Sequence, residues 1–180
     1  MLVVAPLSIT GVWREEFAKF ADFEYCLEIL EGSGFEKTKA LQKLDSQSGK
    51  LKVAVINYES AWRMENELAF WLAGNKIVDK NGKQSVNAKS LIVCDESSKI
   101  KNRQAKQSKA MHRLGRLSKH NIILTGTPIT NNLLDFYSQY KFLDEKIFGT
   151  SFYVFRARYA ILGGYGNHQI VGYKNLDELT

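Results

Sequence analysis

Residues 91–102 read LIVCDESSKIKN, and this stretch decides the fold class. Its first four residues are apolar, as in a buried strand, and two adjacent carboxylates, Asp95 and Glu96, follow at once. A second stretch, NIILTGTP at 121–128, repeats the pattern of a buried strand that ends in a polar turn. Such strands, separated by helices, are typical of a mainly parallel sheet covered on both faces. The sequence therefore predicts an α/β fold.

The flanking sequence alternates in the same way. Strands are predicted at 2–5, 24–30, 51–58, 90–95 and from 121, and helices at 11–20, 34–44, 60–73 and 131–143, with a basic helix between 96 and 120. Thr10 is the predicted N-cap of the first helix. The polar stretch 74–89 lacks periodicity and is predicted to be an exposed insertion.

Composition limits the class of protein. A chain of 180 residues with 44% hydrophobic residues can bury one sizeable core. It contains no run of about 20 apolar residues and no basic leader before its first apolar run, so we expect a soluble intracellular protein without a membrane segment. Cys26 and Cys94 lie in apolar segments and are predicted to be buried thiols. The three histidines lack ligand spacing, so no zinc site is expected.

The carboxylate pair is the first candidate site. Ligands of open α/β sheets bind beyond the carboxyl ends of the strands, where Asp95 and Glu96 are predicted to lie. An aspartate there can hold Mg²⁺, and a neighbouring glutamate can activate a water for attack on a phosphoryl group. On the pair alone a second interpretation is equally open, in which Asp95 caps a helix and Glu96 favours its dipole.

Two stretches taken together carry a family resemblance. DESSKIKN and LTGTPITNNLLDFYSQYKFL, in this order and separated by a basic helix, resemble motifs II and III of the Swi/Snf-type ATPases in the second helicase superfamily. Upstream, VVAPLSITGVWREEFAKF is similar to motif Ia and VAVINYESAW to the motif Ib region. The resemblance covers about residues 2–144. It implies a RecA-like (P-loop NTPase-type) helicase domain at 1–145, and a DNA-dependent ATP hydrolase that moves along duplex DNA.

The resemblance also implies roles for individual residues. Asp95 would bind Mg²⁺ and Glu96 would be the general base, with Ser97 and Ser98 as their neighbours in motif II. The residues that would couple nucleotide state to movement are Thr125, Gly126, Thr127 and Pro128. The residues that would contact the nucleic-acid backbone are Ala5, Pro6, Leu7 and Ser8. The implied cofactors are ATP and Mg²⁺, and the implied partners are duplex DNA and a second RecA-like domain. The implied setting is cytoplasmic, nucleoid or nuclear.

Two departures from the family pattern matter. No G-x-x-x-x-G-K-[ST] phosphate loop occurs in the 180 residues. The resemblance would place that loop before Met1 and the second motor domain after Thr180, so we expect a fragment that is incomplete at its N-terminus and inactive alone. Ser98 stands where most relatives have a histidine, which puts the coupling to the second domain in doubt. The alternative function is a non-catalytic nucleic-acid-binding or protein-interaction module that retains the RecA-like fold.

The remaining features leave alternatives open. Residues 97–120 hold eight Lys or Arg and no acid. Five of these cations are predicted to share one helix face, either as a solvated surface or as a phosphate-binding one: Arg103, Lys106, Lys109, Arg113 and Arg116. Ala110, Met111, Leu114 and Leu117 are predicted to face the core. The three tryptophans, Trp13, Trp62 and Trp71, are assigned to packing. Residues 146–180 are either an insertion that reaches toward DNA or a connector.

Overall fold

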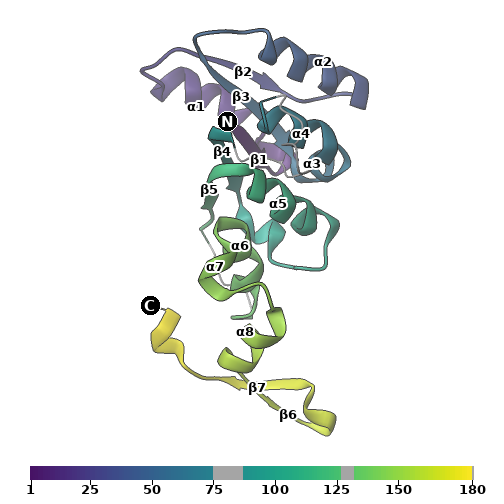
Figure 1. The fold of residues 1–180 in the computed structure, drawn as a ribbon, viewed down its shortest axis with the longest axis vertical. Helices are drawn as coiled ribbons and strands as arrows, with labels where there is room; N and C mark the ends of the chain where they lie inside the picture. Colours follow the sequence, from purple (N-terminus) through teal and green to yellow (C-terminus); the bar gives the residue numbers. More distant parts are fainter. Residues whose placement is uncertain (75–86, 127–131, 180) are drawn as a thin grey trace, which may run out of the picture.

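The computed structural model describes residues 1–74, 87–126 and 132–179 (Figure 1). Its main sheet has five strands in the order β2-β3-β1-β4-β5, and every pairing is parallel. The strands are β1 (Leu2–Ala5), β2 (Tyr25–Ile29), β3 (Leu51–Asn57), β4 (Asn87–Asp95) and β5 (Ser118–Leu124). The predicted α/β class with a mainly parallel sheet is confirmed.

The strand register lines up the carboxyl ends of the strands. Ala5 pairs with Asn57, and Asp95 pairs with Leu124. The central strand β1 is fully buried, because it has a neighbour on each side and helices on each face. The polar segments that follow β1, β3, β4 and β5 therefore emerge at one edge of the sheet.

Helices cover the two faces of the sheet unequally. The first face packs against α2 (Gly34–Asp45), α3 (Tyr58–Arg63), α4 (Glu65–Leu72), α5 (Lys106–Leu117) and α6 (Asp135–Leu143), around a core that includes Ile56, Ile92 and Met111. On the second face, the valines of the sheet pack against Trp13 and Phe17 of α1 (Val12–Phe20). In the part of the chain that the structure describes, α1 is the helix that supplies side chains to this second cluster.

Several predicted boundaries are wrong. The predicted helix at 60–73 is two helices, α3 and α4, interrupted at Met64, whose φ of −107° and ψ of 25° are not helical. Thr10 does not cap α1, because its Oγ1 donates back to the main-chain oxygen of Leu7 at 3.1 Å, and Gly11 occupies the N-cap position. Residues 87–89 belong to β4 rather than to an insertion, and 75–86 lie outside the described residues.

The basic helix is shorter than predicted. It begins at Lys106, so Arg103 lies in the preceding connection and does not share a helical face with Lys109 or Arg113. Its core side is as predicted: Ala110, Met111 and Leu114 are buried, and Leu117 is half-buried.

The C-terminal part forms a second small core. It contains α7 (Glu145–Phe148), α8 (Phe152–Tyr159) and an antiparallel hairpin of β6 (Ala160–Gly163) and β7 (Gln169–Tyr173), which lies at the far end of the molecule from β2 (Figure 1). Leu134 and Tyr137 of the α6 region pack here with Phe155 and Tyr159 of α8. The domain boundary at 145 stays a prediction, as does the role of 146–180.

The two cysteines and the lengths of the helices bear on two further predictions. Cys94 is buried and Cys26 half-buried, and both are free thiols. Burial raises the pKa of the Cys94 thiol well above its usual range, so it is neutral at ordinary pH. Among the described residues, no helix combines the length and apolarity needed to cross a membrane.

Candidate active site

The carboxyl-end edge of the sheet brings three predicted segments together. Pro6 to Ser8 follow β1, Asp95 and Glu96 end β4, and Thr125 follows β5. The strands β1, β4 and β5 are direct neighbours, with β4 in the middle. The carboxylate pair therefore lies between the other two segments, in the position where open parallel sheets bind ligands.

Asp95 is fixed by three hydrogen bonds. Trp13 Nε1 donates to its Oδ2 at 3.0 Å, and the main-chain N–H of Glu96 donates to its Oδ1 at 2.9 Å. The hydroxyl of Tyr58 donates to its main-chain oxygen at 2.7 Å. Burial raises the pKa of Tyr58 far above its usual range, so the phenol stays a neutral donor. Both the side chain and the main chain of Asp95 are held from neighbouring elements.

Asp95 is suited to a magnesium ion. Its side chain is half-buried, and a carboxylate oxygen that accepts one hydrogen bond has a second lone pair left for a ligand. Mg²⁺ is commonly held by one or two carboxylates together with substrate phosphates and waters, so a single aspartate is a sufficient protein ligand. No group of three or more metal-ligating side chains occurs among residues 1–74, 87–126 and 132–179.

Glu96 has an unusual backbone conformation. Its φ of 50° and ψ of 57° lie in the left-handed region, which costs a non-glycine residue about 1–2 kcal/mol. The chain turns sharply there into the short 3₁₀ helix η2 (Ser97–Ile100), and the Glu96 side chain is exposed. Strained non-glycine residues cluster at functional sites. The predicted capping by Asp95 is wrong, since Glu96 takes the N-cap position of η2 and the Asp95 side chain accepts from the N–H of Glu96 itself.

The rest of motif II is attached to α6. Ser97 is fully buried and its hydroxyl donates to Oε1 of Gln139, also fully buried, at 2.7 Å. The main-chain oxygen of Ile100 accepts hydrogen bonds from the hydroxyls of Ser108 and Ser138. Ser98 is half-buried, and its main-chain oxygen accepts from the N–H of Lys101 at 3.3 Å. These buried contacts give η2 a defined position relative to α5 and α6.

The other predicted site residues differ in accessibility. Leu7 and Ser8 are exposed in the 3₁₀ helix η1 (Leu7–Ile9), Pro6 is half-buried and Ala5 is fully buried. The Ala5 side chain is therefore not available to a ligand. Thr125 is half-buried and Gly126 is exposed. The two remaining predicted coupling residues, Thr127 and Pro128, lie outside the described residues.

The basic surface of α5 is partly matched by acids. Arg113 bonds both carboxylate oxygens of Glu65, and Arg116 lies 2.7 Å from Oε2 of Glu145. Lys106 is 4.8 Å from the ring centre of Trp62. Two of the five predicted surface cations therefore serve as links to α4 and α7, which favours the interpretation of a structural, solvated surface.

Sequence reasoning missed three residues that hold motif II: Trp13, Tyr58 and Gln139. Trp13 was assigned to packing, and its ring does pack on Val3 and its neighbours, but its N–H reaches Asp95. An amphipathic residue such as Trp usually finds a partner for its polar end when it is buried. The position of Trp13 within the stretch that resembles motif Ia was the sequence feature that could have indicated a role at the site. Nothing in the local sequence marked Gln139.

Comparisons with known proteins agree with this geometry. The chain matches the family of SNF2-related domains over residues 1–179. It is 30% identical over 158 residues to the Drosophila melanogaster "Transcriptional regulator ATRX homolog", covering 83% of this chain and 12% of that protein. It is 33% identical over 159 residues to the Aspergillus fumigatus "TATA-binding protein-associated factor mot1", covering 88% of this chain and 7% of that protein.

A solved structure shares the fold. The "Sulfolobus solfataricus SWI2/SNF2 ATPase core in complex with dsDNA" superposes with a TM-score of 0.60 at 28% identity, covering 88% of this chain and 27% of that one. The chain thus spans only a small part of the length of these relatives. Its parallel sheet is that of a RecA-like motor domain of this type. The chain belongs to the family of SNF2-related domains.

Proposed function

We propose that this chain supplies the Asp–Glu half of an ATP-hydrolysing site, and a DNA-backbone contact, to a larger Swi/Snf-type motor that moves along duplex DNA inside the cell. The observation that carries the proposal is the position of Asp95 and Glu96 at the end of β4, between the turn after β1 and Thr125 after β5. In this arrangement a ligand at the carboxylates would touch segments from three adjacent strands.

Asp95 would hold the Mg²⁺ that accompanies ATP. Its two hydrogen bonds, from Trp13 and from the N–H of Glu96, orient the carboxylate. When bound, the ion would neutralise charge on phosphate oxygens. The link from Tyr58 to the main-chain oxygen of Asp95 would limit the drift of this ligand during turnover.

Glu96 would accept a proton from the attacking water. Its carboxylate is exposed, while its backbone is fixed in a left-handed turn next to Asp95. A base in this position can reach a water beside a phosphate that Asp95 and its ion would hold. Positioned general bases contribute roughly 10² to 10⁴ in rate.

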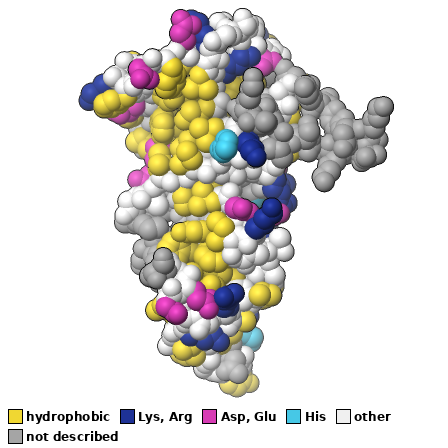
Figure 2. All heavy atoms as spheres, turned by 60° about the vertical axis from the view of Figure 1, so that its left-hand side comes forward, with side chains coloured by type: hydrophobic (Ala, Val, Ile, Leu, Met, Phe, Trp, Pro, Cys, Tyr) yellow, Lys and Arg dark blue, Asp and Glu magenta, His cyan; other side chains and the backbone are white. Residues whose placement is uncertain are grey.

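The 180 residues would need a phosphate loop from elsewhere, and their surface is compatible with added structure. Strand β5 has one described neighbour, β4, and Ile122 and Leu124 are 42% and 41% exposed. Figure 2 brings the α1 and β5 side forward and shows hydrophobic side chains gathered in a band down this face. Exposed apolar bands and open strand edges are typical places for further packing. Because the 180 residues contain no phosphate loop, we expect no ATP turnover by the chain alone.

The test is a charge-neutral substitution at Glu96. In a protein that joins this chain to a phosphate loop and a second RecA-like domain, Glu96→Gln should lower DNA-stimulated ATP hydrolysis by roughly 10² to 10⁴ and leave nucleotide binding in place. Glu67→Gln, an exposed glutamate on α4, is the matched control and should hydrolyse ATP normally. Turnover at the unsubstituted rate by the Glu96→Gln protein would reject Glu96 as the base.

The second candidate is a non-catalytic module. The lack of a phosphate loop in the 180 residues favours it. If the joined protein hydrolyses no ATP while the chain still binds DNA or a protein, the non-catalytic function is the correct one.

A further inference from the structure

A cavity of about 450 Å³, which neither Asp95 nor Glu96 lines, lies where the C-terminal part of the chain meets the end of motif II. It is bounded by the connection between η2 and α5, the start of α6, helix α8 and the β6–β7 hairpin. Its size falls in the range of small-molecule sites. Its charged and polar lining residues are Lys101, Asn102, Arg103, Asn132, Asp135, Arg156 and His168.

The charge of this cavity is positive. Lys101, Arg103 and Arg156 stand against a single acid, Asp135, whose Oδ2 is 3.8 Å from Lys101 Nζ. Among the described lining residues, these three cations and one acid leave two formal positive charges. A phosphate monoester carries about −1.5 to −2 at neutral pH, so its charge matches the surplus.

Arg103 and Arg156 differ from most arginines of the chain. Four of the seven arginines form ion pairs: Arg63, Arg113, Arg116 and Arg158. Within the part of the chain that the structure describes, neither Arg103 nor Arg156 has a carboxylate within ion-pair distance. Both line this one cavity. Their donors are thus available to an anion from outside the chain.

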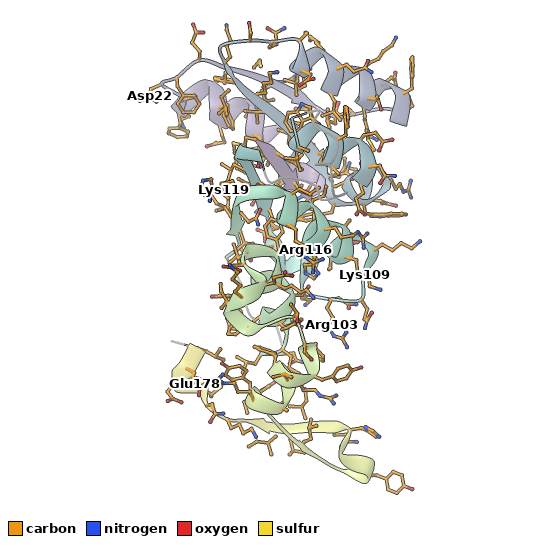
Figure 3. The ribbon with its side chains drawn as sticks, in the orientation of Figure 1. Asp22, Arg103, Lys109, Arg116, Lys119 and Glu178 are labelled. Carbon is orange, nitrogen blue, oxygen red and sulfur yellow. The ribbon has the colours of Figure 1, made fainter. Side chains whose placement is uncertain are left out.

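Aromatic rings orient both guanidinium groups. Arg103 lies 4.0 Å from the ring centre of Phe152, and Figure 3 places it between the start of α5 and α8. Arg103 and Arg156 both approach the ring of Tyr153, at 5.8 Å and 5.4 Å. Stacking restrains the guanidinium plane while its N–H edge stays free for bidentate bonding to an oxyanion. Two such groups beside one ring can converge on one phosphate.

The remaining wall of the cavity is apolar. It is formed by Leu134, Phe152, Leu162 and Ile170. A site for a bare inorganic ion would not need this surface, whereas a phosphate attached to a sugar and base would cover it. Asn102 and Asn132 add amide groups that can bond to hydroxyls or ring nitrogens.

We propose that this cavity binds the phosphate monoester of a nucleotide or of a 5′-phosphorylated nucleic-acid end, with Arg103 and Arg156 as the groups that bond the phosphate. The two sources share one chemistry, a terminal phosphate followed by a nucleoside. Neither Asp95 nor Glu96 lines this cavity, so the proposal does not rest on the proposed ATPase function and survives if that function fails.

The test uses the 180-residue chain and measures binding by calorimetry or fluorescence anisotropy. AMP should bind at least about 10-fold more tightly than adenosine, because charge-assisted hydrogen bonds outweigh neutral ones. A 5′-phosphorylated oligonucleotide is then compared with the same strand bearing a 5′-hydroxyl. Preference for the phosphorylated strand identifies a nucleic-acid end as a source, and binding of AMP without that preference identifies a free nucleotide.

Variants locate the site. Arg103→Gln and Arg156→Gln should each weaken binding of the phosphorylated ligand by about 10-fold. Arg158→Gln removes the same charge from the same helix outside the cavity and should have little effect. Arg103→Lys keeps the charge but loses the planar guanidinium group that can bond two phosphate oxygens at once, so it should also weaken binding. Thermal unfolding of each variant establishes that it is folded.

Four results would overturn the proposal. The first is equal affinity for phosphorylated and unphosphorylated ligands. The second is unchanged binding by a folded variant that carries both Gln substitutions. The third is an equal loss in Arg158→Gln, which would mean that the general positive charge of the chain attracts the ligand. Displacement of AMP by an acidic peptide rather than by inorganic phosphate would likewise assign the cavity to carboxylates.

Discussion

Trp13 Nε1 lies 3.0 Å from Oδ2 of Asp95, and this hydrogen bond joins α1 to the end of β4. Helix α1, which carries Trp13, follows η1, which carries the exposed residues Leu7 and Ser8, after only Thr10 and Gly11. The residue that bonds the proposed magnesium ligand is therefore a near neighbour in the chain of the proposed DNA contact. This arrangement offers a short physical route by which DNA binding could alter the orientation of Asp95.

The first prediction concerns this link. Trp13→Phe keeps an aromatic ring in the packing against the sheet but removes the N–H donor. Loss of a partner that orients a metal ligand typically costs 10- to 100-fold in metal affinity, so we expect the Mg²⁺ requirement of the joined protein to rise by about 10-fold. A magnesium titration of ATPase activity measures it. Trp62→Phe, which alters an aromatic on α3, should leave the titration unchanged.

The sequence predicted the sheet well for a physical reason. Strand β1 and the central residues of β3 and β4, 53–56 and 92–94, are buried apolar runs, and such a run identifies a strand that is buried on both faces. Asp95 and Glu96 were placed correctly at a strand end because charge cannot continue into that core. The candidate site was therefore predicted at the level of which segments meet.

Other features depend on contacts between distant residues, which sequence patterns do not encode. Ser97 and Gln139 bond to each other across 42 residues, and nothing in the sequence around either residue identifies the other as its partner. Thr10 resembles an N-cap by position, yet its hydroxyl bonds to Leu7 because the preceding turn is a 3₁₀ helix. Met64, where the predicted helix breaks, is buried in the main core, and the sequence around it contains no Pro or Gly that would indicate a break.

The second prediction uses the strain at Glu96. Since its φ is 50°, Glu96→Gly should raise the free energy of unfolding by up to about 1 kcal/mol relative to Glu96→Ala. The same pair of substitutions at Lys39, an exposed position within α2, should show the opposite order, because glycine in a helix costs about 1 kcal/mol relative to alanine. Urea unfolding of the four variants compares them. A Glu96→Gly protein less stable than Glu96→Ala would contradict a strained backbone.

The third prediction concerns acid stability. His112 is buried, and its Nε2 lies 2.8 Å from the main-chain oxygen of Ser138. Burial, with a smaller effect from the nearby cations Lys141, Arg116 and Arg113, lowers the pKa of His112 from its ordinary 6.5 to about 4. The unfolded chain therefore binds this proton more readily than the folded one. The contribution of neutral His112 to the free energy of unfolding is fully present above about pH 6.5 and is lost as the pH drops toward 4.

Between about pH 7 and pH 5 the expected loss is about 2 kcal/mol in the free energy of unfolding. Urea unfolding at a series of pH values measures it. His112→Gln, which can still donate to Ser138, should flatten the pH dependence, whereas His120→Gln at an exposed position should not. A steep dependence that persists in His112→Gln would assign the effect to other groups.

The last prediction concerns how DNA is held. If Ser8 contacts the phosphate backbone, Ser8→Ala should weaken duplex binding or ATPase stimulation of the joined protein at every DNA sequence tested, because backbone contacts carry no sequence information.

A cation that neutralises one phosphate contributes about 0.9 to the slope of log affinity against log salt. Arg113 is bound to Glu65, so Arg113→Gln should leave this slope unchanged. Titrations of labelled duplex at several salt concentrations decide both points. Normal binding and stimulation by Ser8→Ala would remove the turn after β1 from the DNA path, and a flatter slope in Arg113→Gln would bring α5 into it.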